Sequence, residues 1–450
     1  MNGLSDGITM VKTVKVQEWE SFPKEAGKTL AGVFLPEDPA IRDAVTKLSR
    51  YKKLHIEELR HGIRVRATSW VGRITLGDLQ ISVEPKITGM PLLRLLRYAY
   101  GLRKLDLHGK SSYDVESLSF LDLLIHQLAA ETEELMRRGL RRAYVRQDAY
   151  LAVPRGRLDV QRYVRDAATV TTALPCSFHP RTEDTLLNQV LLAGVRLGSR
   201  LTADPMLRAT LSSRCRTLEE EISTVRLDWS LLQRVRQGMS RLTHAYDSTL
   251  ALIEMLMGAQ GVSLEGEANS IAVPSFLFDM NRFFQALLSR FLSENLTGFT
   301  VKDEHILRGM MTYDSQHNPR HQSSPAPRPD FVVLQADKIV AVLDAKYRDL
   351  WETPLPREML YQLAIYALSQ RERRVATILY PTLNASATEA HVVINDAVEG
   401  RRTGRVILRP VNLHLFEPML TDPSRTKERH TFASRLVFGE RSDTKGGLEP

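Results

Sequence analysis

Two apolar runs with a short polar break between them lie in the last third of the chain. Residues 331–334 and 339–345 are mainly apolar, and residues 336–338 form the break. Runs of this length and spacing predict a β-hairpin. Because side chains alternate across a strand, Asp344 and Lys346 are expected to project together from one face of the second strand.

Segments with apolar residues at helical spacing lie before and after this hairpin in the sequence. Residues 358–368 fit an amphipathic helix, in which Gln362 and Tyr366 share one face. Upstream, the spacing predicts a helix that begins near Leu277 and runs to about Glu294. A hairpin between two helices indicates a mixed α/β region.

The N-terminal part of the chain is patterned mainly for strands. Residues 11–16 alternate apolar and polar positions, and residues 62–75 are rich in β-branched and aromatic residues before a turn into residues 79–83. Helices are predicted over residues 39–51 and 91–100. This part is therefore expected to be β-rich.

The middle of the chain is patterned for helices. Apolar positions at helical spacing predict helices over residues 119–139 and 182–201 and within residues 227–257. Arginines crowd one part of this region, with few acids nearby. They are Arg137, Arg138, Arg141, Arg142, Arg146, Arg155, Arg157, Arg162 and Arg165.

This arginine-rich segment is a candidate binding surface. Arg137 and Arg141, four positions apart on a predicted helix, would repel each other unless a counter-charge approached. DNA phosphate or an acidic face of a partner protein could supply that charge, whereas a solvated helix face would need no ligand. The candidate DNA- or partner-binding residues are Arg137, Arg138, Arg141, Arg142, Arg155 and Arg157.

Composition narrows the class of protein. The 450 residues are 43% hydrophobic and 25% charged, as in ordinary globular proteins, and a net charge of +8 favours a polyanionic partner. No stretch is apolar for long enough to form a transmembrane helix, and residues 1–10 lack a signal-peptide pattern, so we expect a cytoplasmic protein without a membrane partner. The two cysteines are too few for an iron–sulfur cluster held by four thiolates and are expected to be buried thiols.

Candidate chemistry gathers at the hairpin. Asp330, at the start of one strand, and Asp344, near the end of the other, offer two carboxylates to Mg²⁺, which takes oxygen ligands and keeps several waters. Lys346 beside them could orient or help deprotonate an attacking water and offset negative charge on a phosphate. These residues predict metal-dependent phosphodiester hydrolysis. The alternative is a solvated strand end with an Asp–Lys ion pair.

The hairpin and the helix after it resemble the PD-(D/E)xK nuclease superfamily. The matching residues are Pro329, Asp330, Asp344, Lys346, Gln362 and Tyr366. The resemblance implies a restriction-endonuclease-like domain with Mg²⁺ as its cofactor. It also implies that Gln362 and Tyr366 lie beside the metal and contact the substrate.

The upstream helix departs from the superfamily pattern. Such nucleases commonly place a Glu there to complete the metal shell, and the matching position is Gln285. An amide keeps an oxygen ligand but loses the negative charge, so the affinity for metal should fall. Asp279 and Glu294 match less well and could compensate.

Short motifs elsewhere in the chain resemble the McrC family. They are residues 70–74, 81–87, 154–158, 183–188 and 279–282. McrC proteins are endonuclease subunits of modification-dependent, phage-defence restriction systems, and their partner McrB is a hexameric AAA+ GTPase that recognises modified cytosine. The resemblance implies that this chain stimulates such a motor and cuts when the motor stalls. Phe22 stands where a phosphate-binding loop would need its first glycine, so the GTPase must be another chain.

These observations predict an α/β fold (α+β overall) in four regions. They are a β-rich partner-docking region at 11–114, a helical, arginine-rich region at 115–265, a nuclease domain at 266–420 and a flexible tail at 421–450. The expected reaction is Mg²⁺-dependent cutting of modified double-stranded DNA, with Asp330, Asp344 and Gln285 as metal ligands. One site cuts one strand, so a double-strand break needs self-association or two visits. A catalytically weak scaffold that activates the motor and only holds DNA is the alternative.

Overall fold

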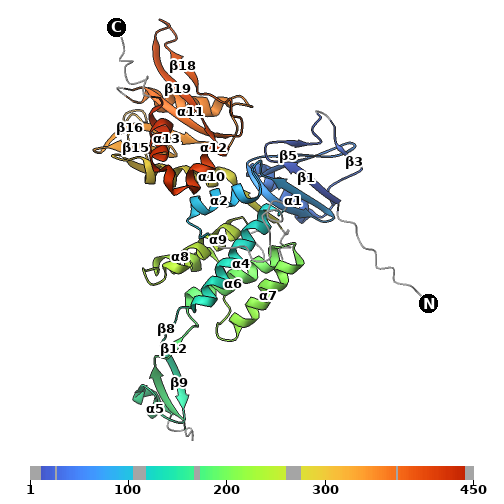
Figure 1. The fold of residues 1–450 in the computed structure, drawn as a ribbon, viewed down its shortest axis with the longest axis vertical. Helices are drawn as coiled ribbons and strands as arrows, with labels where there is room; N and C mark the ends of the chain where they lie inside the picture. The colour runs from blue at the N-terminus through green and yellow to red at the C-terminus, as the bar shows by residue number, and fades with distance from the viewer. Residues whose placement is uncertain are drawn as a thin grey trace, which may run out of the picture. The chain divides into compact units, whose positions relative to one another are not determined.

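A computed structural model describes residues 12–25, 28–104, 118–166, 173–259, 275–370 and 373–440. The fold mixes helices with several β-sheets, which confirms the predicted α/β (α+β) class. The described chain forms two compact units, each of which can be followed by colour in Figure 1. The split unit contains the described residues up to Gly101 and from Ser275 onward, and the inserted unit contains those from Leu102 to Ala259. The predicted region boundaries near 114 and 265 lie outside the described residues.

The first sheet of the split unit joins segments from both parts of the sequence. Its strands are ordered β1 (Lys12–Gln17), β7 (Leu79–Glu84), β6 (Trp70–Leu76) and β13 (Ser275–Asp279). β1 is parallel to β7, and β6 pairs antiparallel with β7 and with β13. The helix predicted from Leu277 is therefore wrong at its start, because these apolar residues complete the edge of β6. The β-rich region and the nuclease region share one unit.

A second, smaller sheet and two helices complete the N-terminal segment. The strands of this sheet are β2 (Ser21–Phe22), β3 (Leu30–Ala31), β4 (Leu54–Leu59) and β5 (Gly62–Ala67). The helices are α1 (Pro39–Arg50) and α2 (Gly89–Tyr100), as predicted. Asp38 begins α1, since its carboxylate accepts the N–H of Ala40 (2.8 Å).

The other large sheet of the split unit has six strands in the order β14-β15-β16-β17-β19-β18. They are β14 (Thr300–Asp303), β15 (Phe331–Gln335), β16 (Lys338–Ala345), β17 (Val375–Thr382), β18 (Ala390–Asn395) and β19 (Arg402–Asn412). β15 and β16 form the predicted antiparallel hairpin, and Ala336 and Asp337 make its turn with positive φ. β17 lies parallel to both β16 and β19.

Helices cover this sheet. α11 (Arg357–Leu368) packs against β16, β17 and β19, where Val342 joins its buried apolar cluster. Alternation along the strand turns the next side chains to the opposite face. There Tyr347 meets the ring of Phe284 from α10 (Met280–Asn295), with centroids 6.0 Å apart. α12 (Leu413–Thr421) packs against β19.

Part of the predicted flexible tail is a helix, α13 (Thr426–Phe438), after a 3₁₀ turn at Pro423–Arg425. Its apolar residues return at helical spacing, and the ring of Phe432 packs 5.9 Å from Phe291 of α10. The tail prediction is wrong for these residues because they bury an apolar face. The predicted tail residues 441–450 lie outside the described residues.

The inserted unit contains a group of helices that matches the helical pattern. They are α4 (Phe120–Arg138), α6 (Leu186–Leu201), α7 (Pro205–Glu219), α8 (Trp229–Gln237) and α9 (Asp247–Gly258), with a 3₁₀ turn at His244–Tyr246. α6 begins later than predicted, because Thr185 caps it and Thr182 belongs to a strand. Among the described helices, none is long and apolar enough to cross a membrane.

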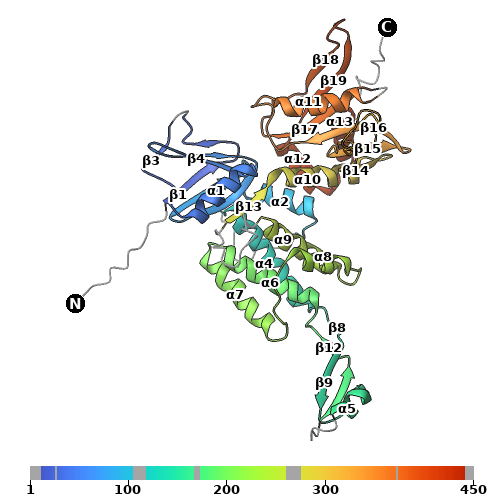
Figure 2. The same ribbon diagram turned by 180° about the vertical axis from the view of Figure 1, so that it is seen from behind.

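A β-extension that the sequence pattern did not predict interrupts these helices. It consists of β8 (Ala143–Tyr144), β9 (Gln147–Leu151), β10 (Arg157–Leu158), α5 (Val160–Asp166), β11 (Leu174–Phe178) and β12 (Arg181–Thr182). Figures 1 and 2 place β9 and α5 at the end of this unit farthest from α7, α8 and α9. Cys176 in β11 and Cys215 in α7 are buried free thiols, as predicted.

Candidate active site

Three charged side chains meet at the end of the β15–β16 hairpin. Asp330 directly precedes β15, and Asp344 lies on β16. The Nζ atom of Lys346 lies 3.6 Å from a carboxylate oxygen of Asp330 and 3.1 Å from one of Asp344. Asp330 also accepts the N–H of Ala345 (2.7 Å), which ties the two strands together at the site. The structure thus brings together the three residues that the sequence suggested as the catalytic centre.

The two carboxylates, Asp330 and Asp344, repel each other electrostatically. Burial and the neighbouring charge of Asp344 raise the pKa of Asp330 well above its usual range. Burial alone would lower the pKa of Lys346, but both carboxylates outweigh it and the net change is upward. Lys346 therefore keeps its proton, which suits it to stabilise negative charge rather than to remove a proton from water.

The donor set fits Mg²⁺. A divalent cation would relieve the repulsion that raises the pKa of Asp330, and carboxylate oxygens are the ligands that this ion prefers. The described residues contain no group of three or more His, Cys, Asp or Glu side chains that could hold a metal. Asp330 and Asp344 would thus be the protein carboxylates, with waters and a substrate phosphate beside them, which is common for Mg²⁺.

Gln362 and Tyr366 of α11 form a hydrogen-bonded pair near this centre. The amide of Gln362 donates to the Tyr366 hydroxyl (3.0 Å). Burial raises the pKa of Tyr366, and the charges of Asp344 and Asp330 add to that rise, which places the phenol within reach of their field. The hydroxyl therefore stays neutral and can donate a hydrogen bond to an anion.

Gln285 lies half-buried on α10, one turn after Asn281. The side-chain oxygen of Asn281 accepts the N–H of Tyr347 (3.1 Å), the residue directly after Lys346. The face of α10 that carries Gln285 therefore adjoins the strand end that carries the site, because residues four apart share a helix face.

Both carboxylates suggested as substitutes for the missing Glu have other partners. Asp279 caps α10 by accepting the N–H of Asn281 (2.9 Å). Glu294 accepts a hydrogen bond from the Tyr98 hydroxyl (2.5 Å) and pairs with Arg290 (2.7 Å). Both acids are engaged in holding α10 in place, so Gln285 has no carboxylate replacement among these two.

Two residues that directly follow β1, Glu18 and Trp19, hold Tyr347, the residue after Lys346, and the sequence pattern did not indicate this contact. The indole N–H of Trp19 donates to the carbonyl of Tyr347 (2.8 Å), and the Tyr347 hydroxyl donates to Glu18 (2.9 Å). Glu18 is fully buried and also accepts the N–H of Lys86 (2.7 Å). These partners lie 328 and 329 residues apart in the chain, so spacing gave no signal.

Residues 65–381, more than half of the chain, match the family described as McrBC 5-methylcytosine restriction system component. The chain belongs to the McrBC family. This match confirms the resemblance drawn from the short motifs. No curated protein matches the chain.

One solved structure agrees with this family membership at the level of the fold. A chain of a Thermococcus gammatolerans half-complex, from a tetradecameric assembly of McrB AAA+ hexamers with bound McrC, matches at 20% identity with a TM-score of 0.58. The match covers 95% of this chain and 100% of that chain. The cryo-EM structure of the Thermococcus gammatolerans McrBC complex matches at 21% identity over 63% of this chain and 88% of that chain, with a TM-score of 0.43 that is too low to bear on the fold.

Three of the six candidate arginines of this McrBC family member pair with acids. The predicted repulsion between Arg137 and a residue four positions on does not arise, because α4 ends at Arg138. Arg137 and Arg138 both pair with Glu134, at 2.8 and 2.5 Å. Arg142 pairs with Glu183 (2.9 Å). The expectation that few acids balance this segment is therefore wrong for Arg137, Arg138 and Arg142.

The remaining candidate arginines lie at and beyond the base of the β-extension. Arg141 precedes β8, and its backbone N–H donates to the Tyr246 hydroxyl (3.0 Å). Arg155 and Arg157 are exposed, and the guanidinium of Arg155 lies 4.9 Å from the ring centre of Phe178. All six candidates belong to the inserted unit, whereas the carboxylates belong to the split unit.

Proposed function

We propose that this McrBC family member is a Mg²⁺-dependent endodeoxyribonuclease of a modification-dependent restriction system that acts in the cytoplasm against foreign DNA. The observation that carries the proposal is the ammonium of Lys346 within 3.6 Å of two carboxylates that repel each other. A structural ion pair needs one acid, and a second buried carboxylate makes such a pair less stable. Ionisable groups whose pKa is shifted by burial and by a neighbouring like charge are common in catalytic sites.

Each residue of the centre has a role in this proposal. Asp330 and Asp344 would hold Mg²⁺, with the amide oxygen of Gln285 as a further ligand. The bound ion supplies polarisation of the phosphate and a lowered pKa for the attacking water. Lys346 would stabilise the charge that grows on the phosphate, and the Tyr366 hydroxyl, oriented by Gln362, would bind a phosphate oxygen.

The proposed partner is a hexameric AAA+ GTPase of the McrB type, since family membership and the fold both agree with an McrC-like subunit. The motor would recognise the modified DNA, and this chain would stimulate GTP hydrolysis and cut. Arg155 and Arg157, exposed on the β-extension, remain candidates for contact with the motor or DNA. A double-strand break would need a second copy of the chain or a second visit.

Cleavage of methylated and unmethylated plasmid tests this proposal. The purified chain is assayed in Mg²⁺ with and without the neighbouring AAA+ protein and GTP, beside the same reactions in EDTA. We expect cutting only when methylated DNA, Mg²⁺, motor and GTP are all present. Absence of cutting in every mixture, while the chain still stimulates GTP hydrolysis, would instead support the catalytically weak scaffold.

Gln285 is the observation that favours the scaffold as the second candidate. Gln285→Glu restores a carboxylate at this position and should raise metal affinity. For a working nuclease adapted to glutamine, we expect cutting to change by less than about tenfold, or 1.4 kcal/mol. A gain well beyond that, measured in initial cutting rates across a Mg²⁺ titration, would mark the natural site as degenerate.

A further inference from the structure

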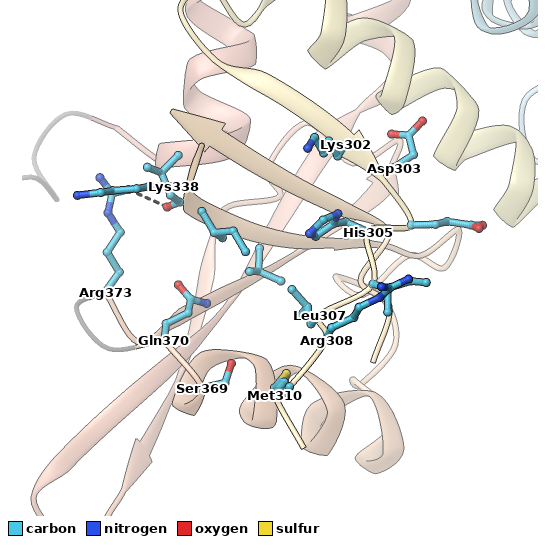
Figure 3. A pocket seen from close by; sticks show the side chains of 16 residues that line it. Lys302, Asp303, His305, Leu307, Arg308, Met310, Lys338, Ser369, Gln370 and Arg373 are labelled. Carbon is cyan, nitrogen blue, oxygen red and sulfur yellow. Dashed lines mark hydrogen bonds between the residues drawn. The ribbon is translucent and has the colours of Figure 1, made fainter. Parts of the chain in front are cut away.

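A groove of about 1350 Å³ lies beside the start of β16 (Figure 3). The loop after β14, residues 304–310, lines one side, and Ser369 and Gln370 at the end of α11 line the other. The first residues of β16 contribute the floor between them. Its lining does not include Asp330, Asp344 or Lys346.

Strand alternation places this groove on the same face of the sheet as the carboxylates. Val342 lines the groove and lies two residues before Asp344 on the regular part of β16, so both side chains project to one face. On β14, Lys302 pairs with Val332, which pairs with Val342, so the Lys302 side chain projects to this face too.

The distance from the groove to the centre suits a DNA duplex. Lys338 stands six residues before Asp344, which corresponds to about 20 Å along a strand. One DNA strand carries a phosphate roughly every 3.4 Å along the helix axis. A duplex held at Asp344 could therefore reach the groove with phosphates about six base pairs from the cut.

Exposed cations from separate segments gather around the groove. They are Lys302 of β14, Arg308 of the following loop, Lys338 of β16 and Arg373 after α11. Figure 3 shows Arg373 reaching toward β16, where its guanidinium donates to the carbonyl of Val340 (3.3 Å). The two acids of the lining have partners of their own. Asp303 accepts a hydrogen bond from Ser289, and Glu304 lies 4.0 Å from Arg328.

We propose that this groove binds the phosphate backbone of double-stranded DNA beyond the cleavage site. The inference rests on the proposed nuclease function and specifies which surface carries its substrate. An acidic amphipathic segment of a partner protein is the competing occupant, because Ile339 and Leu307 add apolar surface to the lining. The cations favour DNA, because they come from segments that are far apart in the sequence, and Lys302 shares the face of the carboxylates.

Charge reversal tests the groove. Lys302→Glu combined with Lys338→Glu is compared with Lys15→Glu combined with Arg401→Glu, which reverses two exposed cations outside the groove lining. Binding of the full chain to an unmodified duplex of about three helical turns is measured in EDTA across a KCl series, so that cutting does not interfere. Circular dichroism and thermal melting confirm that both variants fold.

We expect the groove variant to bind at least about tenfold more weakly at 0.1 M KCl. The slope of log K against log salt should also fall by about 2, because two lysines would no longer neutralise phosphates. The control variant should stay within about twofold of the wild type. An unchanged slope in the groove variant would overturn the proposal, and loss of motor binding at the same time would assign the groove to a partner segment.

This assay keeps the two proposals separate. A chain that never cuts DNA, but whose salt slope falls in the groove variant, would contradict the nuclease and leave the groove standing. A chain that cuts normally, with equal slopes in the groove and control variants, would contradict the groove alone.

Discussion

The end of β16 and the arginine-rich segment of the inserted unit differ in the burial and pairing of their charged side chains. At β16, Asp330, Asp344 and Lys346 share one largely buried centre in which like charges face each other. Along the inserted unit, exposed arginines are matched with nearby acids, as Arg137 and Arg138 are with Glu134.

The contrast teaches that the density of charge along the sequence is a poor guide to function. Nine arginines in one stretch drew attention in the sequence, yet the structure compensates several of them at the surface, where ion pairs contribute little. Three charged residues at a strand end are few, but their burial leaves a repulsion between carboxylates that a bound cation would relieve.

Among the variants that test this comparison, Asp344→Asn should have the largest effect on DNA cutting. We expect cutting to fall by at least about a thousandfold, more than roughly 4 kcal/mol, because the amide keeps an oxygen but loses the negative charge that holds the metal. Thermal stability should hold or rise, because the substitution removes a charge that repels Asp330. Plasmid cutting and thermal melting measure both effects.

Asp337→Asn is the matched control for this variant. Asp337 lies in the exposed turn of the same hairpin with positive φ, a conformation that Asn tolerates, so cutting and stability should stay near wild type. If Asp344→Asn lost motor binding as completely as cutting, the centre would be a structural element rather than a nuclease site.

Glu18→Gln should reduce the dependence of folding stability on pH. Burial raises the pKa of Glu18 to about 7 despite its hydrogen bonds, against 4.5 for the ordinary carboxyl. The folded state therefore holds a proton that the unfolded state releases, and stability falls as pH rises from about 4.5 to about 7. Glutamine mimics the protonated form, so the variant should gain stability above pH 7, by up to the order of 3 kcal/mol.

Urea unfolding between pH 4.5 and 8 measures this gain. The difference between variant and wild type should be near zero at the acid end and grow toward pH 8. Glu57→Gln, at an exposed position of β4, should show no such divergence. Parallel curves for Glu18→Gln and wild type would show that Glu18 does not titrate in this range.

Replacing both Arg137 and Arg138 with alanine should have the smallest effect. Their pairing with Glu134 is exposed at the end of α4, so we expect the melting temperature to shift by less than about 2 °C. DNA binding and stimulation of the motor should change by less than about threefold. A loss of either activity beyond tenfold would show that these arginines leave Glu134 to bind a ligand.

Local patterns carried the predictions that succeeded. The β15–β16 hairpin needed only two apolar runs and a polar break, and its geometry follows from alternation within 15 residues of sequence. Lys346 meets both carboxylates for the same reason. Gln362 and Tyr366 pair because a helix turn brings residues four apart together.

The sequence pattern did not predict elements that depend on partners distant in the chain. β13 is a strand because β6 offers an open edge, although the same apolar residues can continue into a helix. The β-extension has strands of only two to five residues, so alternation had too little length to show. In α13, Phe432, Leu436 and Val437 do recur at helical spacing, a signal that the polar residues around them obscured.

Placing β13 beside β6 has a consequence for the synthesis of this protein. The two strands share a sheet, yet β13 begins 199 residues after β6 ends. A ribosome that adds roughly 5–20 residues per second needs about 10–40 s to cross that distance. For that time the edge of β6 lacks its native neighbour and is open to pairing with other chains. A nuclease fragment begun near residue 266 would carry β13 without the strand that receives it, so the intact chain is the better starting point for expression.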